Sequence, residues 1–234
     1  KRNLEGSCLQ EVTDRDHFTE AMAEMVLLCN EVIRRQAQEH RETKTKKSPK
    51  RTSSKPLSLE YIADRIDVDD PLFGYYVRTA PSSKKGGSEE TGVNSSKLTE
   101  GMLQGFICVT TFTNWQKTFR WDSLHDSAFS YDDETVAEQV VKEERKYDTN
   151  GKLSEELESL VRCGDPWNEG IVWPRIAEIS LLGGLGCGKT LLSLVIEKLE
   201  SMPPNGKQNY DYVVLQATDN SVPFYESMGF IRVG

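Results

Sequence analysis

Apolar and polar positions recur along this chain with two periods, one typical of helices and one typical of strands. A shorter helix over 57–66 and β-type runs at 73–79 and 102–113 are predicted, and the two runs would pair as a hairpin. Before them, apolar residues over 16–40 return every three or four positions. That spacing predicts the buried face of a long helix, which carries Phe18, Met22, Met25, Val26, Cys29, Val32 and Ile33.

The last third of the chain has the densest pattern. A strand at 175–182 leads through glycines into a helix at 188–202. A second strand at 212–217, a short helix at 222–228 and the start of another strand at Phe230 follow. This mixture of elements predicts an α+β fold, and the glycines place the chemistry in this part of the chain.

Three polar segments separate the predicted elements. The basic linker 41–56 holds seven basic residues and one acidic residue; its KTKKSPKR run resembles a nuclear localisation signal, and a solvated linker explains it equally well. The segment 81–97 is rich in Ser, Lys and Gly, which predicts a flexible hairpin loop. The acidic insertion 126–168 has eleven acidic and four basic residues between Asp126 and Glu158. It is either a solvated surface or one that attracts a Lys-rich partner.

The length of 234 residues fits a single domain, and the net charge of −8 restricts its partners. An acidic chain is a poor direct binder of nucleic acid, because phosphate contacts need clustered Lys and Arg. The apolar runs fall far short of the roughly 20 residues that span a bilayer, and no basic-plus-apolar leader opens the sequence. Neither a signal peptide nor a membrane partner is therefore expected. Because it starts with Lys1 and stops abruptly at Gly234, we expect a fragment with further domains or a larger complex around it.

Cysteine and histidine usage argues against a disulfide framework and against a metal site. The five cysteines are odd in number and show no C-x-x-C spacing, and three histidines add no readable ligand cluster. No metal cofactor is therefore expected. A reducing, intracellular compartment follows, and the basic run narrows this to the nucleus or the nucleocytoplasm.

The segment 183–190, called the glycine loop below, reads GGLGCGKT and satisfies G-x-x-x-x-G-K-[ST], the pattern of a P-loop. It follows an apolar strand and opens an apolar helix, as a P-loop does. Only 44 residues follow Thr190, however, and the later strand YVVLQATD is a poor magnesium-binding strand, because Gln216 and Thr218 interrupt it before Asp219. A P-loop nucleoside triphosphatase is therefore the less favoured alternative.

The same glycines resemble a second signature, since backbone N–H groups at the start of a helix bind many anions. The residues 183–188 are similar to the Q/R-x-x-G-x-G/A motif of the GNAT superfamily of acetyl-CoA-dependent N-acyltransferases, with Gly183 in place of Gln or Arg. The segment 215–230 resembles the end of the same domain in its L-x-A, D-N, F-Y and Gly-Phe elements and in its distance from the glycine loop. The interval between 177–179 and the glycines is shorter than in the family. The resemblance implies a mixed, mostly antiparallel central sheet flanked by helices.

The resemblance also implies roles for individual residues. Tyr225 matches the tyrosine that protonates the departing thiolate of coenzyme A, and a buried packing residue is its structural alternative. Glu178 resembles the general base of histone-type enzymes, with a surface charge on an edge strand as its alternative. The implied acetyl-CoA contacts come from a strand, the glycine loop and the second motif: Leu181, Leu182, Gly183, Gly184, Leu185, Gly186, Cys187, Gly188, Lys189, Thr190, Asn220, Phe224 and Tyr225.

These residues predict an enzyme that transfers an acetyl group from acetyl-CoA to a primary amine by direct attack in a ternary complex. The acidic charge favours a basic protein substrate such as a histone tail, acetylated on lysine, and a small polyamine is the competing acceptor. A non-catalytic acyl-CoA-binding or interaction module on the same fold is the other alternative. The tryptophans around the insertion either line an acceptor groove or pack the insertion onto the domain: Trp115, Trp121, Trp167 and Trp173.

Overall fold

The computed structural model describes residues 6–42, 56–69, 72–80, 101–125, 146–203, 209–218 and 221–233. Most of the predicted basic linker, all of the predicted loop 81–97 and the first part of the acidic insertion, 126–145, lie outside these residues. The chain divides into two compact units. The first unit comprises Lys1–Thr111 and Glu178–Asn209, and the second comprises Phe112–Ala177 and Tyr210–Gly234.

In the part of the chain that is described, six strands form one sheet. Their order is β1-β2-β3-β5-β4, and β6 also pairs with β5. The pairs β1–β2, β2–β3 and β4–β5 are antiparallel. The predicted α+β class with a mostly antiparallel sheet flanked by helices is therefore confirmed. The strands are β1 Ser7–Val12, β2 Phe73–Thr79, β3 Leu103–Asn114, β4 Cys163–Asp165, β5 Gly170–Gly184 and β6 Tyr212–Val214.

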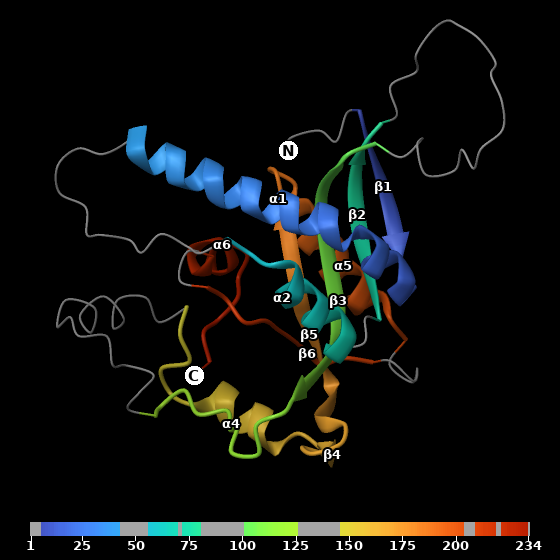
Figure 1. The fold of residues 1–234 in the computed structure, drawn as a ribbon. Helices are drawn as coiled ribbons and strands as arrows, with labels where there is room; N and C mark the ends of the chain where they lie inside the picture. Colours follow the sequence, from blue (N-terminus) through green and yellow to red (C-terminus); the bar gives the residue numbers. More distant parts are fainter. Residues whose placement is uncertain are drawn as a thin grey trace, which may run out of the picture. The chain divides into compact units, whose positions relative to one another are not determined.

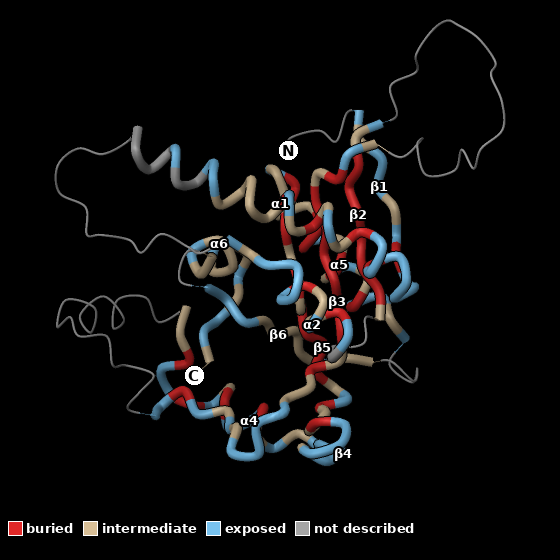
Figure 2. Tube along the Cα trace, in the orientation of Figure 1, coloured by how far each residue is buried: buried red, intermediate tan, exposed pale blue. Residues whose placement is uncertain are grey.

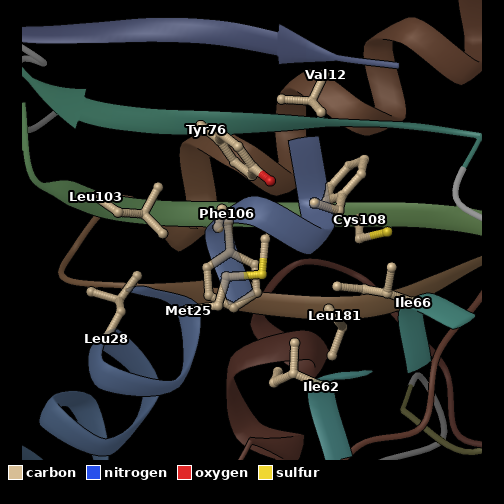
Figure 3. Close-up of a cluster of buried hydrophobic side chains, with 12 residues drawn as sticks. Val12, Met25, Leu28, Ile62, Ile66, Tyr76, Leu103, Phe106, Cys108 and Leu181 are labelled. Atoms are coloured by element: carbon tan, nitrogen blue, oxygen red, sulfur yellow. The ribbon is translucent and has the colours of Figure 1, made fainter. Parts of the chain in front are cut away.

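In the first unit, helices cover both faces of the sheet (Figure 1). Helices α1 (Arg15–Glu42) and α2 (Leu59–Asp69) lie on one face, and α5 (Gly188–Ser201) lies on the other. Helix α1 has the buried face that the sequence predicts, since its buried side chains are spaced by three or four residues. The core between these helices and the strands is drawn in Figure 3 and consists of Val12, Phe18, Ala21, Met25, Leu28, Ile62, Ile66, Tyr76, Leu103, Phe106, Cys108 and Leu181.

Helix α5 packs closely against β3 because β3 has a glycine at the contact. A Cβ atom on Gly105 would overlap the sulfur of Cys187 and lie 3.0 Å from Leu191 Cδ1. Leu191, Leu192, Val195 and Leu199 of α5 are buried, as the helical spacing of these residues requires. Figure 2 shows the buried positions concentrated along the strands that this helix and α1 cover.

The second unit has an aromatic core. Phe112 lies 5.1 Å, between ring centroids, from both Trp121 and Trp173, and Phe119 contacts the same two tryptophans. Trp173 is fully buried, so packing is its structural role. Trp115 and Trp167 are 44% and 78% exposed, so these two tryptophans do not have this packing role. The helices of this unit are α4 (Lys152–Ser159) and α6 (Val222–Ser227).

Several sequence predictions need correction. Strand β1 was not predicted, because its sequence SCLQEV lacks an apolar run; it forms by pairing along the edge of β2. Strand β6 ends at Val214, three residues earlier than predicted. No strand begins at Phe230 in the described residues; Arg232 there forms an isolated bridge with Tyr147. Such short or edge segments depend on tertiary pairing more than on local pattern.

A buried aspartate organises the start of α4. Asp148 is 6% exposed and accepts hydrogen bonds from the Ser123 hydroxyl at 2.5 Å and from the amides of Ser154 and Leu153 at 2.9 and 3.2 Å. Burial acts to raise the pKa of Asp148, but these hydrogen bonds together lower it below the ordinary value of 3.8. The carboxylate therefore serves as the cap of α4, which has no side-chain cap at Gly151.

The variant Asp148→Asn is expected to lower the free energy of unfolding by about 1–3 kcal/mol at pH 7, because hydrogen bonds to a buried charge are lost. Since the folded-state pKa is depressed, the contribution of Asp148 is present above its ordinary pKa and disappears as the pH falls through the folded-state pKa. Urea unfolding between pH 7 and pH 3 should show the difference between variant and wild type shrinking. Asp122→Asn, which alters an exposed carboxylate bonded to the Leu124 amide, is the control and should change stability by less than about 0.5 kcal/mol. A constant difference at all pH values would contradict the role of the Asp148 charge.

Candidate active site

The glycine loop contains a three-residue turn between a strand and a helix. Strand β5 ends at Gly184 and α5 begins at Gly188. Within the turn, Gly186 has φ +87°, a conformation that residues with a Cβ rarely adopt. The Leu185 amide donates to the Gln104 carbonyl of β3 at 2.9 Å, which fixes the start of the turn. The glycine at 186 therefore allows β5 to lead directly into α5.

The first turn of α5 presents backbone donors. The first hydrogen bond of the helix runs from the Leu191 amide to the Cys187 carbonyl at 3.0 Å. The amides of Gly188, Lys189 and Thr190 lie before it and have no acceptor within the helix. The Cys187 side chain provides no cap. Uncapped amides and the positive end of the helix dipole together favour a bound anion such as a phosphate.

The first two glycines of the loop belong to the strand and serve packing. A Cβ atom on Gly183 would lie 2.7 Å from Phe106 Cε1 and 3.0 Å from Cys29 Sγ, and one on Gly184 would lie 3.0 Å from Cys187 Sγ. A Gln or Arg side chain at position 183 would therefore not fit. Only Leu185, Gly186 and Cys187 thus lie between the strand and the helix.

The side chains of the glycine loop differ in exposure. Cys187 is 7% exposed, its thiol donates to the Gln104 carbonyl at 3.4 Å, and burial raises the pKa of this thiol. A protonated, buried thiol is a poor nucleophile. Lys189 is exposed and Thr190 is half-buried. Leu185 packs against the core of the first unit, as does Leu181, whereas Leu182 is half-buried.

Glu178 is buried in the sheet and ion-paired. Its side chain is 3% exposed, and Arg65 Nη2 of α2 donates to Glu178 Oε1 at 2.7 Å. Glu178 is therefore not a surface charge on an edge strand: β5 has neighbours on both sides in the sheet order. Sequence reasoning missed Arg65. A signal existed, because Arg65 follows Ile62 by three residues and so lies on the buried face of α2, where a basic residue requires an acidic partner.

The second motif forms a short helix with a Schellman cap. The Phe230 amide donates to the Tyr225 carbonyl at 3.2 Å, the Gly229 amide donates to the Glu226 carbonyl at 3.1 Å, and Gly229 has φ +93°. The rings of Tyr225 and Phe230 are 5.8 Å apart, which is the apolar contact that accompanies this cap. The spacing from Phe-Tyr to Gly-Phe is thus the sequence signature of a cap that fixes Tyr225.

Tyr225 is half-buried, and desolvation raises the pKa of its hydroxyl to about 12. In the described part of the chain, no hydrogen bond to this hydroxyl is present, so it is available as a donor. The ring of Phe224 lies 5.0 Å from that of Tyr225. Asn220, the remaining predicted contact of this motif, lies outside the described residues.

The structure groups the predicted site residues into two sets. Glu178, Leu181, Leu182 and the glycine loop follow one another along β5 and α5 in the first unit. Phe224 and Tyr225 lie on α6 in the second unit. Among the described residues, no group of three or more His, Cys, Asp or Glu side chains is arranged to hold a metal ion, and no helix is both long and apolar enough to cross a membrane.

Comparison with known proteins gives little further information. No model of a known protein family matches this chain, and no protein with a curated description matches it. Among solved structures, an acetyltransferase of Trypanosoma brucei is similar to it at 14% sequence identity, with 96% of this chain and 94% of that chain covered and a TM-score of 0.33. A likeness at this level shows neither a family nor an activity.

Proposed function

We propose that this chain is an N-acetyltransferase of the GNAT type that uses acetyl-CoA. The observation that carries the proposal is the turn from β5 into α5, where Gly186 at positive φ leads to a helix start with uncapped amides. This arrangement suits the pyrophosphate of coenzyme A. The capped helix that holds Tyr225 supports the same proposal, because the two motifs occur together in the GNAT superfamily.

The proposed reaction joins an amine nitrogen to the acetyl carbonyl carbon and breaks the bond from that carbon to the sulfur of coenzyme A. Glu178 accepts the proton that the attacking amine loses, and the Tyr225 hydroxyl donates a proton to the leaving thiolate. A pKa of about 12 keeps Tyr225 protonated at neutral pH, as a proton donor must be. The amides of Leu181 and Leu182 would bind the pantetheine arm, and Asn220 and Phe224 would contact the cofactor from the second motif.

The first test of this proposal compares ligands and turnover. Acetyl-CoA at 100 times its Kd should raise the free energy of unfolding by about 2.7 kcal/mol, whereas ATP with Mg²⁺ should leave it unchanged. Thermal unfolding with each ligand measures this. Stabilisation by ATP–Mg²⁺ alone would restore the P-loop alternative. Stabilisation by acetyl-CoA without release of coenzyme A in the presence of any amine would identify a non-catalytic acyl-CoA-binding module.

We further propose a lysine-rich protein segment as the acceptor, in the nucleus or nucleocytoplasm. The support is the net charge of −8, the acidic insertion and the KTKKSPKR run. In the same turnover assay, a basic histone-tail peptide should be acetylated with a kcat/KM that falls as salt rises, because opposite charges speed the encounter. Neutralising Asp132, Asp133, Glu143 and Glu144 should remove most of this salt dependence. Acetylation of spermidine but not of the peptide would reject the protein acceptor.

A further inference from the structure

Arg65 of α2 and Glu178 of β5 form an ion pair within the first unit, although 113 positions separate them in the sequence. Arg65 Nη2 lies 2.7 Å from Glu178 Oε1, and the two side chains are 23% and 3% exposed. Ile62 and Ile66, which flank Arg65 on α2, are fully buried in the core, so the helix holds the guanidinium in place.

The surroundings of Glu178 are buried. Side chains alternate between the two faces of a strand, so Ile176 and Ser180 are the neighbours of Glu178 on its own face of β5. Ile176 is 0% exposed, and Ser180 is half-buried. A carboxylate in such surroundings is costly to keep ionised unless a cation and hydrogen bonds offset the lost hydration. Arg65 supplies both, because a guanidinium is always charged and donates directly to the carboxylate oxygen.

Stability alone gives a weak reason for this pair. Apolar residues of similar volume commonly replace a buried ion pair at no cost in stability. Helix α2 has other attachments, namely the buried Ile62 and Ile66 and an ion pair in which Arg15 of α1 binds Asp67 at 2.8 Å. Beyond these attachments, the pair with Arg65 provides an ionised, immobile carboxylate at position 178.

We infer that Arg65 is a positioning residue that keeps Glu178 ionised and fixes Oε1, so that the carboxylate can receive the proton of the attacking amine. This inference rests on the function proposed above. In this role Arg65 acts through Glu178 and not on the reacting atoms themselves. The inference predicts that Glu178 stays ionised under mildly acidic conditions, where a carboxyl at the same buried position without this cation would be protonated.

The test replaces the cation and follows the pH dependence. In Arg65→Met, the acidic limb of the kcat/KM profile should move to higher pH by about one unit or more, with a loss on the order of tenfold at pH 6.5. Arg65→Lys should restore most of the wild-type profile, since it keeps the charge. Arg15→Met, which removes the other ion pair to α2, is the matched control and should leave the profile in its wild-type position. Coincident profiles for Arg65→Met and wild type would overturn the inference.

A second readout does not depend on turnover. In protein labelled with ¹³C at the glutamate carboxyl carbon, with Glu178→Gln used for assignment, the Glu178 signal should titrate at higher pH in Arg65→Met than in wild type. If wild type shows no turnover but this difference is present, the proposed function fails while the role of Arg65 in ionising Glu178 stands. If Arg65→Met does not fold, Arg65→Lys is compared with wild type instead. Its Glu178 signal should titrate at a higher pH than in wild type, by a smaller shift than that expected for Arg65→Met. Identical titration in both foldable proteins would reject the inference.

Discussion

Gly186→Val is expected to abolish acetyl-CoA binding by a protein that still folds. Valine at φ +87° is strained by about 1–3 kcal/mol or more, and relief of this strain must change the turn from β5 into α5. The amides at the start of α5 would then no longer converge on one phosphate. Isothermal titration with acetyl-CoA should detect no binding at concentrations that saturate wild type. Gly188→Val, at the first residue of α5, is expected to have the same effect.

Two control variants distinguish an effect on the turn from a general loss of stability. Gly6 also has a positive φ, +80°, in the first unit, and a Cβ there would contact nothing within 4 Å. Gly6→Val should therefore lower stability without a loss of acetyl-CoA affinity. Lys189→Ala should weaken binding only modestly, because Lys189 is exposed and the backbone supplies the main donors. A loss of binding in Lys189→Ala as large as in Gly186→Val would contradict this account.

Tyr225→Phe is expected to lower kcat on the order of 100-fold while acetyl-CoA affinity stays near the wild-type value. The phenylalanine ring keeps the contacts with Phe224 and Phe230, and the Schellman cap depends on backbone groups, so the fold should persist. Only the proton donor is removed. Single-turnover kinetics with saturating acetyl-CoA would measure the effect on the chemical step.

Tyr212 provides a matched control for Tyr225. It lies in the same unit, and a hydrogen bond with Glu156 raises the pKa of its hydroxyl to about 12 as well. Tyr212→Phe should leave kcat unchanged, since Tyr212 belongs to the packing around the aromatic core. An unchanged kcat in Tyr225→Phe would leave Tyr225 with a packing role only. Equal losses in both variants would point to a structural effect on the second unit.

The local structure around Tyr225 could be predicted only in part from the sequence. The sequence predicted a short helix at 222–228, and the structure shows the cap bonds that require the spacing from Phe-Tyr to Gly-Phe. The glycine loop was similarly visible as a strand-to-helix connection. The assignment of its glycines required the structure, because Phe106 and Cys29, which exclude a side chain at Gly183, are distant in the sequence.

Helices and strands with a local signal could be predicted from the sequence alone. Helix α5 and strand β2 match the predicted ranges closely, because α5 repeats its apolar residues at helical spacing and β2 is a short, mostly apolar run. The tertiary structure decided which residues meet. It paired β1 with β2, buried Trp173 while Trp167 stayed exposed, and joined Arg65 to Glu178. Such contacts depend on how distant segments pack, and the period of a single segment specifies which face is buried but not what covers it.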